Sequence, residues 1–76
     1  MATFHIKLVN RDFTSTNSID APSAEAARSE ALKGGLQVGM EEVCGGKPFF
    51  GAEIRIESEE GVVERMMVAM GTTPLR

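Results

Sequence analysis

Residues 23–46 of the chain read SAEAARSEALKGGLQVGMEEVCGG and predict one long amphipathic helix. Ser23 is the expected N-cap, because its hydroxyl can accept a hydrogen bond from a free N–H of the first turn. Glu25 lies in that turn, where a negative charge suits the helix dipole. Gly45-Gly46 and then Pro48 predict the end of the helix.

Rows of residues spaced by four divide the predicted helix into a polar half and an apolar half. The polar row is Glu25, Ser29, Lys33, Gln37 and Glu41. The mostly apolar row is Arg28, Leu32, Leu36, Met40 and Cys44. The small row beside it is Ala27, Ala31, Gly35 and Gly39. The apolar and small rows therefore form the half of the helix that is expected to cover a sheet.

Gly34-Gly35 lies in the middle of this helix, where each glycine costs about 1 kcal/mol relative to alanine. Close packing of the small row against a sheet would offset that cost, and this is our main interpretation. A kink or break at the glycines, and the close approach of a partner's backbone, are the alternatives that the sequence leaves open.

Two strands are predicted before the helix. Residues 2–9 alternate, which is typical of a strand with one buried face. One side carries Phe4, Ile6 and Leu8, and the other carries His5, Lys7 and Val9. Asn10-Arg11-Asp12 predicts a turn, because Asn and Asp side chains bond their own backbone. Residues 13–19, FTSTNSI, predict a polar edge strand whose pairing stays open.

A hairpin is predicted after the helix. Phe50 is expected in the core and Phe49 against the helix end. Ser58-Glu59-Glu60-Gly61 predicts a tight turn with glycine in the left-handed conformation. The register that follows from this turn pairs Ile56 with Glu64, Ile54 with Met66, and Ala52 with Val68.

This order of elements predicts an α+β fold with two layers. One amphipathic helix packs on a three- or four-stranded antiparallel sheet, in the order β-β-α-β-β. We expect a single domain over residues 1–76, with residues 71–76 as a loose tail. One helix covers only one face of the sheet, so the other face is expected to be open. The candidate partner-contact residues on that open face are Val9, Val63, Arg65 and Met67.

Composition narrows the possible classes of function. Hydrophobic residues make up 42% of the chain and charged residues 25%, which is typical of a folded protein. A net charge of −3 disfavours a nucleic-acid binder, which usually has a basic excess. The N-terminus does not resemble a signal peptide, and no apolar run approaches the length of a bilayer. With one cysteine in the chain, these features predict a cytoplasmic protein without membrane contact.

No catalytic, cofactor or metal motif is recognisable. The glycines fit neither a dinucleotide-binding fingerprint nor a P-loop. His5 and Cys44 are the only residues of their types, so a Cys/His zinc site lacks ligands and an internal disulfide cannot form. We expect His5 to be an ordinary surface histidine and Cys44 to be a quiet, partly buried thiol.

Three segments resemble a family of short, mainly proteobacterial proteins that is labelled only as a domain of unknown function. The segments are Phe4-His5-Ile6, the helix portion 24–32, and the hairpin with Ile54-Arg55-Ile56 and Gly61. The resemblance spans most of the chain and implies the same fold, but it brings no catalytic residues. This chain departs from the family at Phe13-Thr14-Ser15-Thr16, where family members often have an acidic, glycine-containing segment.

The expected function is therefore a non-enzymatic interaction or regulatory module, with a protein partner or a second copy of itself. A chain of 76 residues forms only a small core, and without disulfide or metal, self-association is the remaining route to extra stability. The alternative is a nucleic-acid-associated regulatory domain that resembles small antitoxin-like proteins.

Overall fold

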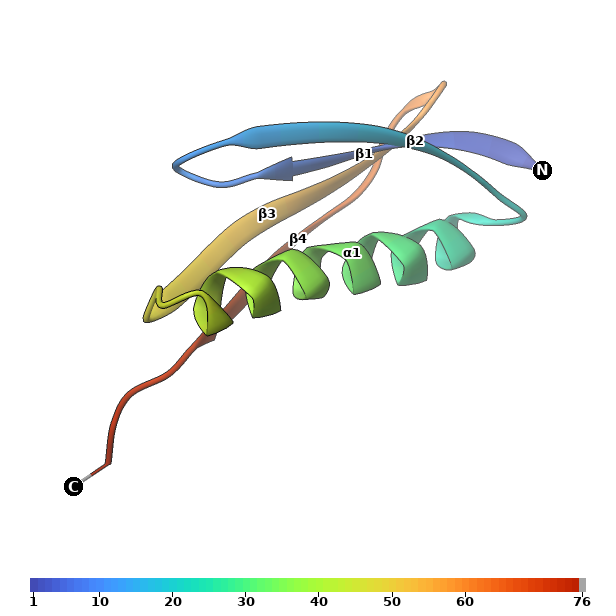
Figure 1. Cartoon of the computed structure of the whole chain (residues 1–76). Helices are drawn as coiled ribbons and strands as arrows, with labels where there is room; N and C mark the ends of the chain where they lie inside the picture. The colour runs from blue at the N-terminus through green and yellow to red at the C-terminus, as the bar shows by residue number, and fades with distance from the viewer. Residues whose placement is uncertain (76) are drawn as a thin grey trace.

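The computed structural model describes residues 1–75, in which one helix covers one face of a four-stranded sheet (Figure 1). In chain order the elements are β1 (Ala2–Val9), β2 (Thr14–Ala21), α1 (Ala24–Cys44), β3 (Phe49–Ser58) and β4 (Gly61–Gly71). The strands lie in the order β2-β1-β3-β4, and every neighbouring pair is antiparallel. The predicted α+β fold and its β-β-α-β-β order are confirmed.

The predicted turn between the first two strands is confirmed. The Asn10 N–H donates to the Phe13 carbonyl at 2.9 Å, and the Asp12 N–H donates to Oδ1 of Asn10 at 2.6 Å. β2 lies at the edge of the sheet, paired with β1 alone. A strand as polar as TSTNSIDA is stable there because an edge strand needs few buried side chains; only Ala21 is fully buried.

The predicted register of the second hairpin is also confirmed. Ile56 lies opposite Glu64, Ile54 opposite Met66, and Ala52 opposite Val68. Gly61 closes the turn at φ +126°, a conformation that favours glycine. The register shifts at Ile56/Glu57, which leaves an irregularity in β4 close to the turn.

The helix begins and ends where the sequence predicts. The Ala26 N–H donates to the Ser23 hydroxyl at 3.1 Å, which confirms the N-cap. At the other end Gly45 is the C-cap, its N–H donating to the Glu41 carbonyl at 2.9 Å. The helix continues through Gly34-Gly35, so a break at those glycines is excluded.

Close packing of the small row on the sheet is confirmed. The buried residues of α1 are Ala27, Ala31, Gly35 and Gly39. A Cβ at Gly35 would lie only 2.5 Å from Cδ1 of Ile54 in β3, whereas a Cβ at Gly34 would have no neighbour within 4 Å. The absence of side-chain bulk at Gly35 lets the side chain of Ile54 pack directly on the helix backbone.

The larger apolar row does not share this burial, which corrects the expectation that the whole apolar half covers the sheet. Leu36 is 40% exposed and Met40 53% exposed, and Leu32 is half-buried. The reason is geometric: a helix seated on its smallest side chains turns its larger apolar row to the flank. α1 lies mainly over β3 and β4, so this flank faces the β4 edge of the sheet.

The core lies between α1 and the middle of the sheet. Its largest fully buried side chains are Ile54 and Ile56, with Phe50 at 2% exposure beside them. The prediction that Phe50 belongs to the core is therefore confirmed. β4 extends as far as Gly71, and residues 72–75 have no regular structure. The last residue of the expected tail, Arg76, lies outside the described residues.

Candidate functional site

The open face, defined as the sheet face away from α1, separates the predicted contact residues. Val9 and Met67 both lie opposite Glu53, from β1 and β4 respectively. They are therefore two strand spacings apart, about 10 Å, with a carboxylate between them. Val63 is 42% exposed near the irregular end of β4, beyond Arg65. The four residues share one region, but they do not form one continuous apolar patch.

Charged side chains occupy the middle of the open face and neutralise one another. Glu53 accepts hydrogen bonds from Nε of Arg65 at 2.5 Å and from Nη2 of Arg55 at 3.4 Å. The hydrogen bond from Arg65 is the main cause that lowers the pKa of Glu53. Lys7 lies 3.8 Å from Glu57 in the same layer. A partner that covered this network would have to remove several paired charges from water, which is costly.

One end of the open face is apolar instead. Met67 is 70% exposed and Phe49 65% exposed, and Ala69 lies beside them on β4. The Phe49 ring lies above Gly51, where a Cβ would be 3.0 Å from its Cε2. We call Phe49, Met67 and Ala69 the apolar end. The expectation that Phe49 packs on the helix end is wrong, because β3 starts at Phe49 and alternation turns it outward when Phe50 turns inward.

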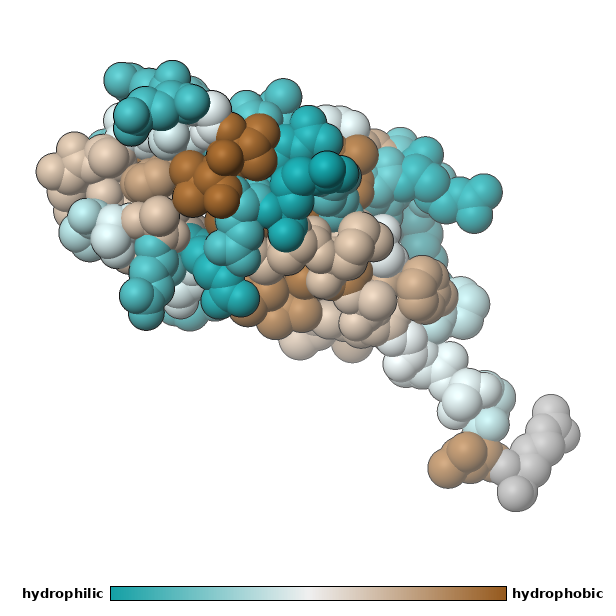
Figure 2. Space-filling model, turned by 180° about the vertical axis from the view of Figure 1, so that it is seen from behind, coloured by the Kyte–Doolittle hydropathy of each residue, from teal (hydrophilic) through white to brown (hydrophobic). Residues whose placement is uncertain are grey.

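The β4 edge adds a second apolar surface. β4 has β3 on one side and no other strand of residues 1–75 on its outer side. Leu36 and Met40 flank this edge from α1, and Met66 and Met70 are half-buried on β4 itself. Figure 2 shows the molecule from behind: apolar surface gathers in its lower middle, next to the point where the C-terminal tail leaves.

Contacts from α1 hold the first part of this edge in place. Nε of Arg28 donates to Oε2 of Glu64 at 2.7 Å, and this contact raises the pKa of Arg28. Glu64 is a residue of the inner face of β4, opposite the buried Ile56. The ion pair thus lets the Glu64 carboxylate face the helix. The rest of β4, from Met66 to Met70, has no charged side chain.

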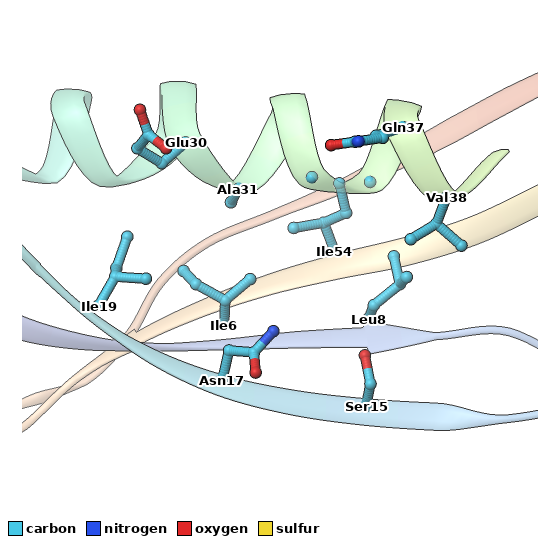
Figure 3. Close-up of a pocket in the computed structure, with 12 residues that line it drawn as sticks. Ile6, Leu8, Ser15, Asn17, Ile19, Glu30, Ala31, Gln37, Val38 and Ile54 are labelled. Carbon is cyan, nitrogen blue, oxygen red and sulfur yellow. The ribbon is translucent and has the colours of Figure 1, made fainter. Parts of the chain in front are cut away.

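A cavity of about 320 Å³ lies on the opposite flank of α1, over β1 and β2. Figure 3 shows Ile6, Leu8 and Ile54 pointing from the sheet toward the helix. The polar residues at its sides are Ser15 and Asn17 from β2 and Glu30 and Gln37 from α1. Gly34 borders this space, and a Cβ there would meet no atom within 4 Å. Its lining is suited to holding an apolar group and contains no histidine, cysteine or lysine.

The two residues considered for chemistry lie apart from this cavity. Nδ1 of His5 is 3.0 Å from the Ser18 hydroxyl, across β1 and β2. Cys44 at the end of α1 is exposed, not partly buried as expected, because its row turns away from the sheet. Within residues 1–75, no three His, Cys, Asp or Glu side chains gather as a metal site would require.

Comparisons with known proteins assign the chain to no family. No protein-family model, curated protein or solved structure matches the chain. Membership of the family of unknown function that the sequence resembles therefore stays a prediction. In the described part of the chain, no helix is long and apolar enough to cross a membrane.

Proposed function

We propose that the protein is a small non-enzymatic interaction module that binds a protein partner in the cytoplasm and needs no cofactor. The observation that carries this proposal is the apolar end. Met67 and Phe49 are 70% and 65% exposed and lie on one side of the same sheet. Exposed apolar side chains that cluster on a small domain are typical of a contact surface.

The placement of the titratable groups supports binding over catalysis. Catalytic acids and bases usually face a cavity, where they are aimed at a reacting group. Here the charged residues of the open face pair with one another at the surface. Glu30, at the side of the 320 Å³ cavity, has the ammonium of Lys33 at 3.8 Å.

The pairing of the basic residues disfavours the nucleic-acid alternative. Phosphate binding needs Lys and Arg side chains that are free to replace counterions. Six of the eight Lys and Arg residues have a carboxylate oxygen within 3.8 Å. These six are Lys7, Arg28, Lys33, Lys47, Arg55 and Arg65.

The cytoplasmic location is supported by Cys44. It is exposed and has no second cysteine with which to form an internal disulfide. An accessible thiol persists most readily in a reducing compartment.

The test is affinity capture with three versions of the tagged protein, from lysate of its native host with and without nuclease. The versions are wild type, Phe49→Glu in the apolar end, and Thr16→Glu as a control. Thr16 lies opposite Lys7 and is exposed, so its substitution adds the same charge to the same face. We expect one protein to be recovered in stoichiometric amount with wild type and Thr16→Glu, and to be lost with Phe49→Glu.

Two outcomes would contradict the proposal. If Phe49→Glu captured the same protein as wild type, the apolar end would not be the contact surface. If the captured material disappeared after nuclease treatment, the nucleic-acid alternative would replace the protein partner.

A further inference from the structure

The backbone of β4 presents unpaired hydrogen-bonding groups to solvent. The Thr72 N–H donates to the Pro48 carbonyl at 2.9 Å, in line with the register that places Gly71 opposite Phe49. Hydrogen-bonded pairs alternate along an antiparallel ladder, so Met70, Val68 and Met66 also bond to β3. The residues between them direct their N–H and C=O groups away from β3. These residues are Arg65, Met67, Ala69 and Gly71.

The flank of α1 extends this edge into a second layer. Leu32, Leu36 and Met40 recur at every fourth position and therefore line one side of the helix. They were expected in the core, yet Leu36 and Met40 are 40% and 53% exposed. Arg28, one turn earlier in the same row, reaches Glu64 of β4, which places this row on the β4 side. A free strand edge and an apolar helix flank thus lie side by side.

We infer that a second copy of this chain covers this edge, with the two β4 strands pairing antiparallel about a two-fold axis near Met67. The inference rests on the proposed function, because it makes a second copy of the chain one of the proteins that the interaction module binds. The axis stands perpendicular to the sheet, so the dimer has one continuous eight-stranded sheet with both helices on the same face.

The spacing of the two layers fits this arrangement. Strands in a sheet lie about 4.8 Å apart, and α1 lies over β3 and β4. A helix midway between those strands is about 2.4 Å inside the line of β4, so the two helix axes would be about 9.6 Å apart. Packed helices are separated by 8–10 Å. Pairing of the strands therefore brings the exposed helix flanks into contact without any rearrangement.

The position of the axis follows from the same contacts. Gly35 lies against Ile54, the partner of Met66, and Gly39 lies against Met70. Leu36 is therefore level with the middle of this stretch of β4. An axis at Met67 brings Leu36 opposite its own copy. It pairs Arg65 with Ala69, which keeps the two guanidinium groups about 13 Å apart along the strand.

The area is adequate for a stable dimer. With the axis at Met67, residues 63–71 of β4 pair with the same residues of the second copy and extend over about 30 Å. The narrower dimensions of the molecule are 20 and 16 Å, so the edge presents a projected area on the order of 500 Å² per copy, or about 1,000 Å² in total, the lower bound for a specific interface. The other edge, β2, is polar, and the flank of α1 on that side carries Glu30 and Gln37 in place of an apolar row. The contact therefore closes after two copies rather than growing into fibres.

The test measures solution mass by sedimentation equilibrium, with one proline substitution at each edge. Ala69→Pro removes an outward N–H of β4 and leaves the bonds to β3 intact. Thr16→Pro is the matched control, because the Asn10–Phe13 bond and the β1–β2 register show that the Thr16 N–H also points outward. We expect about 16 kDa, twice the 8.2 kDa of one chain, for wild type and Thr16→Pro. We expect 8.2 kDa for Ala69→Pro.

A second measurement does not depend on how well a proline variant folds. In a Cys44→Ser background, Met67→Cys places two thiols at the axis, where Cα atoms of a hydrogen-bonded pair are about 5.5 Å apart and within disulfide range. Mild oxidation should convert most of this protein to a covalent dimer. Thr16→Cys in the same background should form no covalent dimer.

A wild-type protein of 8.2 kDa that fails to cross-link through Met67→Cys would overturn the inference. Equal masses for the two proline variants would also overturn it. Neither result bears on partner capture through Phe49, which lies on β3 away from the edge. Phe49→Glu should keep the mass of the dimer and lose the partner, so the two proposals fail independently.

Discussion

Gly39 of α1 lies against the ring of Phe50 in β3, so closely that a Cβ at this position would be 2.8 Å from Cδ2 and 3.1 Å from Cε2. Phe50 is 2% exposed, and the same Cβ would lie 3.2 Å from Cε of Met70, so both neighbours limit the room for a side chain at this position. This approach explains why a residue with poor helix propensity stands in the last part of the helix.

Gly39→Ala is therefore expected to destabilise the protein, although alanine is the better helix former. Overpacking of a core costs about 1–3 kcal/mol, and the gain in helix propensity returns about 1 kcal/mol. Gly34→Ala is the matched control and should stabilise by about 0.5–1 kcal/mol, because its Cβ meets nothing within 4 Å. Urea denaturation at one fixed chain concentration measures both. Shifts in the same direction would contradict the packing account.

The N-cap of α1 is expected to contribute measurably. Ser23→Ala removes the hydroxyl that accepts from the Ala26 N–H and should cost about 1 kcal/mol. Ser29→Ala, on the exposed row of the same helix, controls for loss of a hydroxyl alone and should cost little. The same urea experiment decides: equal effects of the two substitutions would show that the cap makes no contribution.

The Glu53 network predicts a pH dependence of stability. The pKa of Glu53 is lowered chiefly by the hydrogen bond from Arg65, below its usual value of 4.5. A carboxylate whose pKa is lower in the folded state stabilises that state above its unfolded pKa and loses this effect as pH falls through the folded value. Wild type should therefore exceed Glu53→Gln in stability at pH 7, with the difference shrinking below pH 4.5.

Thermal melts from pH 7 to pH 3 measure this difference. Glu59→Gln is the control, since Glu59 is exposed in the turn between β3 and β4. A constant gap between wild type and Glu53→Gln across that range would refute the role of the ion pair.

Cys44 should react in the native protein. It is exposed at the end of α1, so a thiol reagent should label one equivalent per chain without denaturant. The rate should change little when urea unfolds the chain. A rate that rises by orders of magnitude on unfolding would place Cys44 in a buried environment.

The hairpin and the helix ends were predictable because local chemistry determines them. The alternation of Ala52, Ile54 and Ile56, together with the turn at Gly61, sets the β3–β4 register without reference to the rest of the chain. The Ser23 cap is likewise a contact between near neighbours.

The orientation of the helix could not be predicted from hydrophobicity alone. Leu32, Leu36 and Met40 would gain more from burial than Ala27 or Gly39, yet the small residues face the sheet. The orientation of the helix depends on how closely it can approach the strands, and Ile54 and Phe50 leave room only for the small residues of α1.

The open face was predicted only in part for a similar reason. Alternation assigns Val9 and Met67 to the same face, but it does not say which strands are neighbours. The order β2-β1-β3-β4 inserts β3 between them, and Glu53 with it. Phe49 lies on the same face as Met67 because β3 begins at Phe49, one residue before the first inward-facing apolar residue, Phe50.

Amide hydrogen exchange tests the central claim, that β4 is a paired edge, most directly. In the dimer the N–H groups of Arg65, Met67 and Ala69 are hydrogen-bonded to the second copy, whereas those of Thr16 and Ser18 on β2 face water. We predict slow exchange at Met67 and Ala69 that becomes slower as chain concentration rises, and fast exchange at Thr16 and Ser18 at every concentration. Exchange at Met67 and Ala69 as fast as at Thr16 and Ser18 would contradict the account.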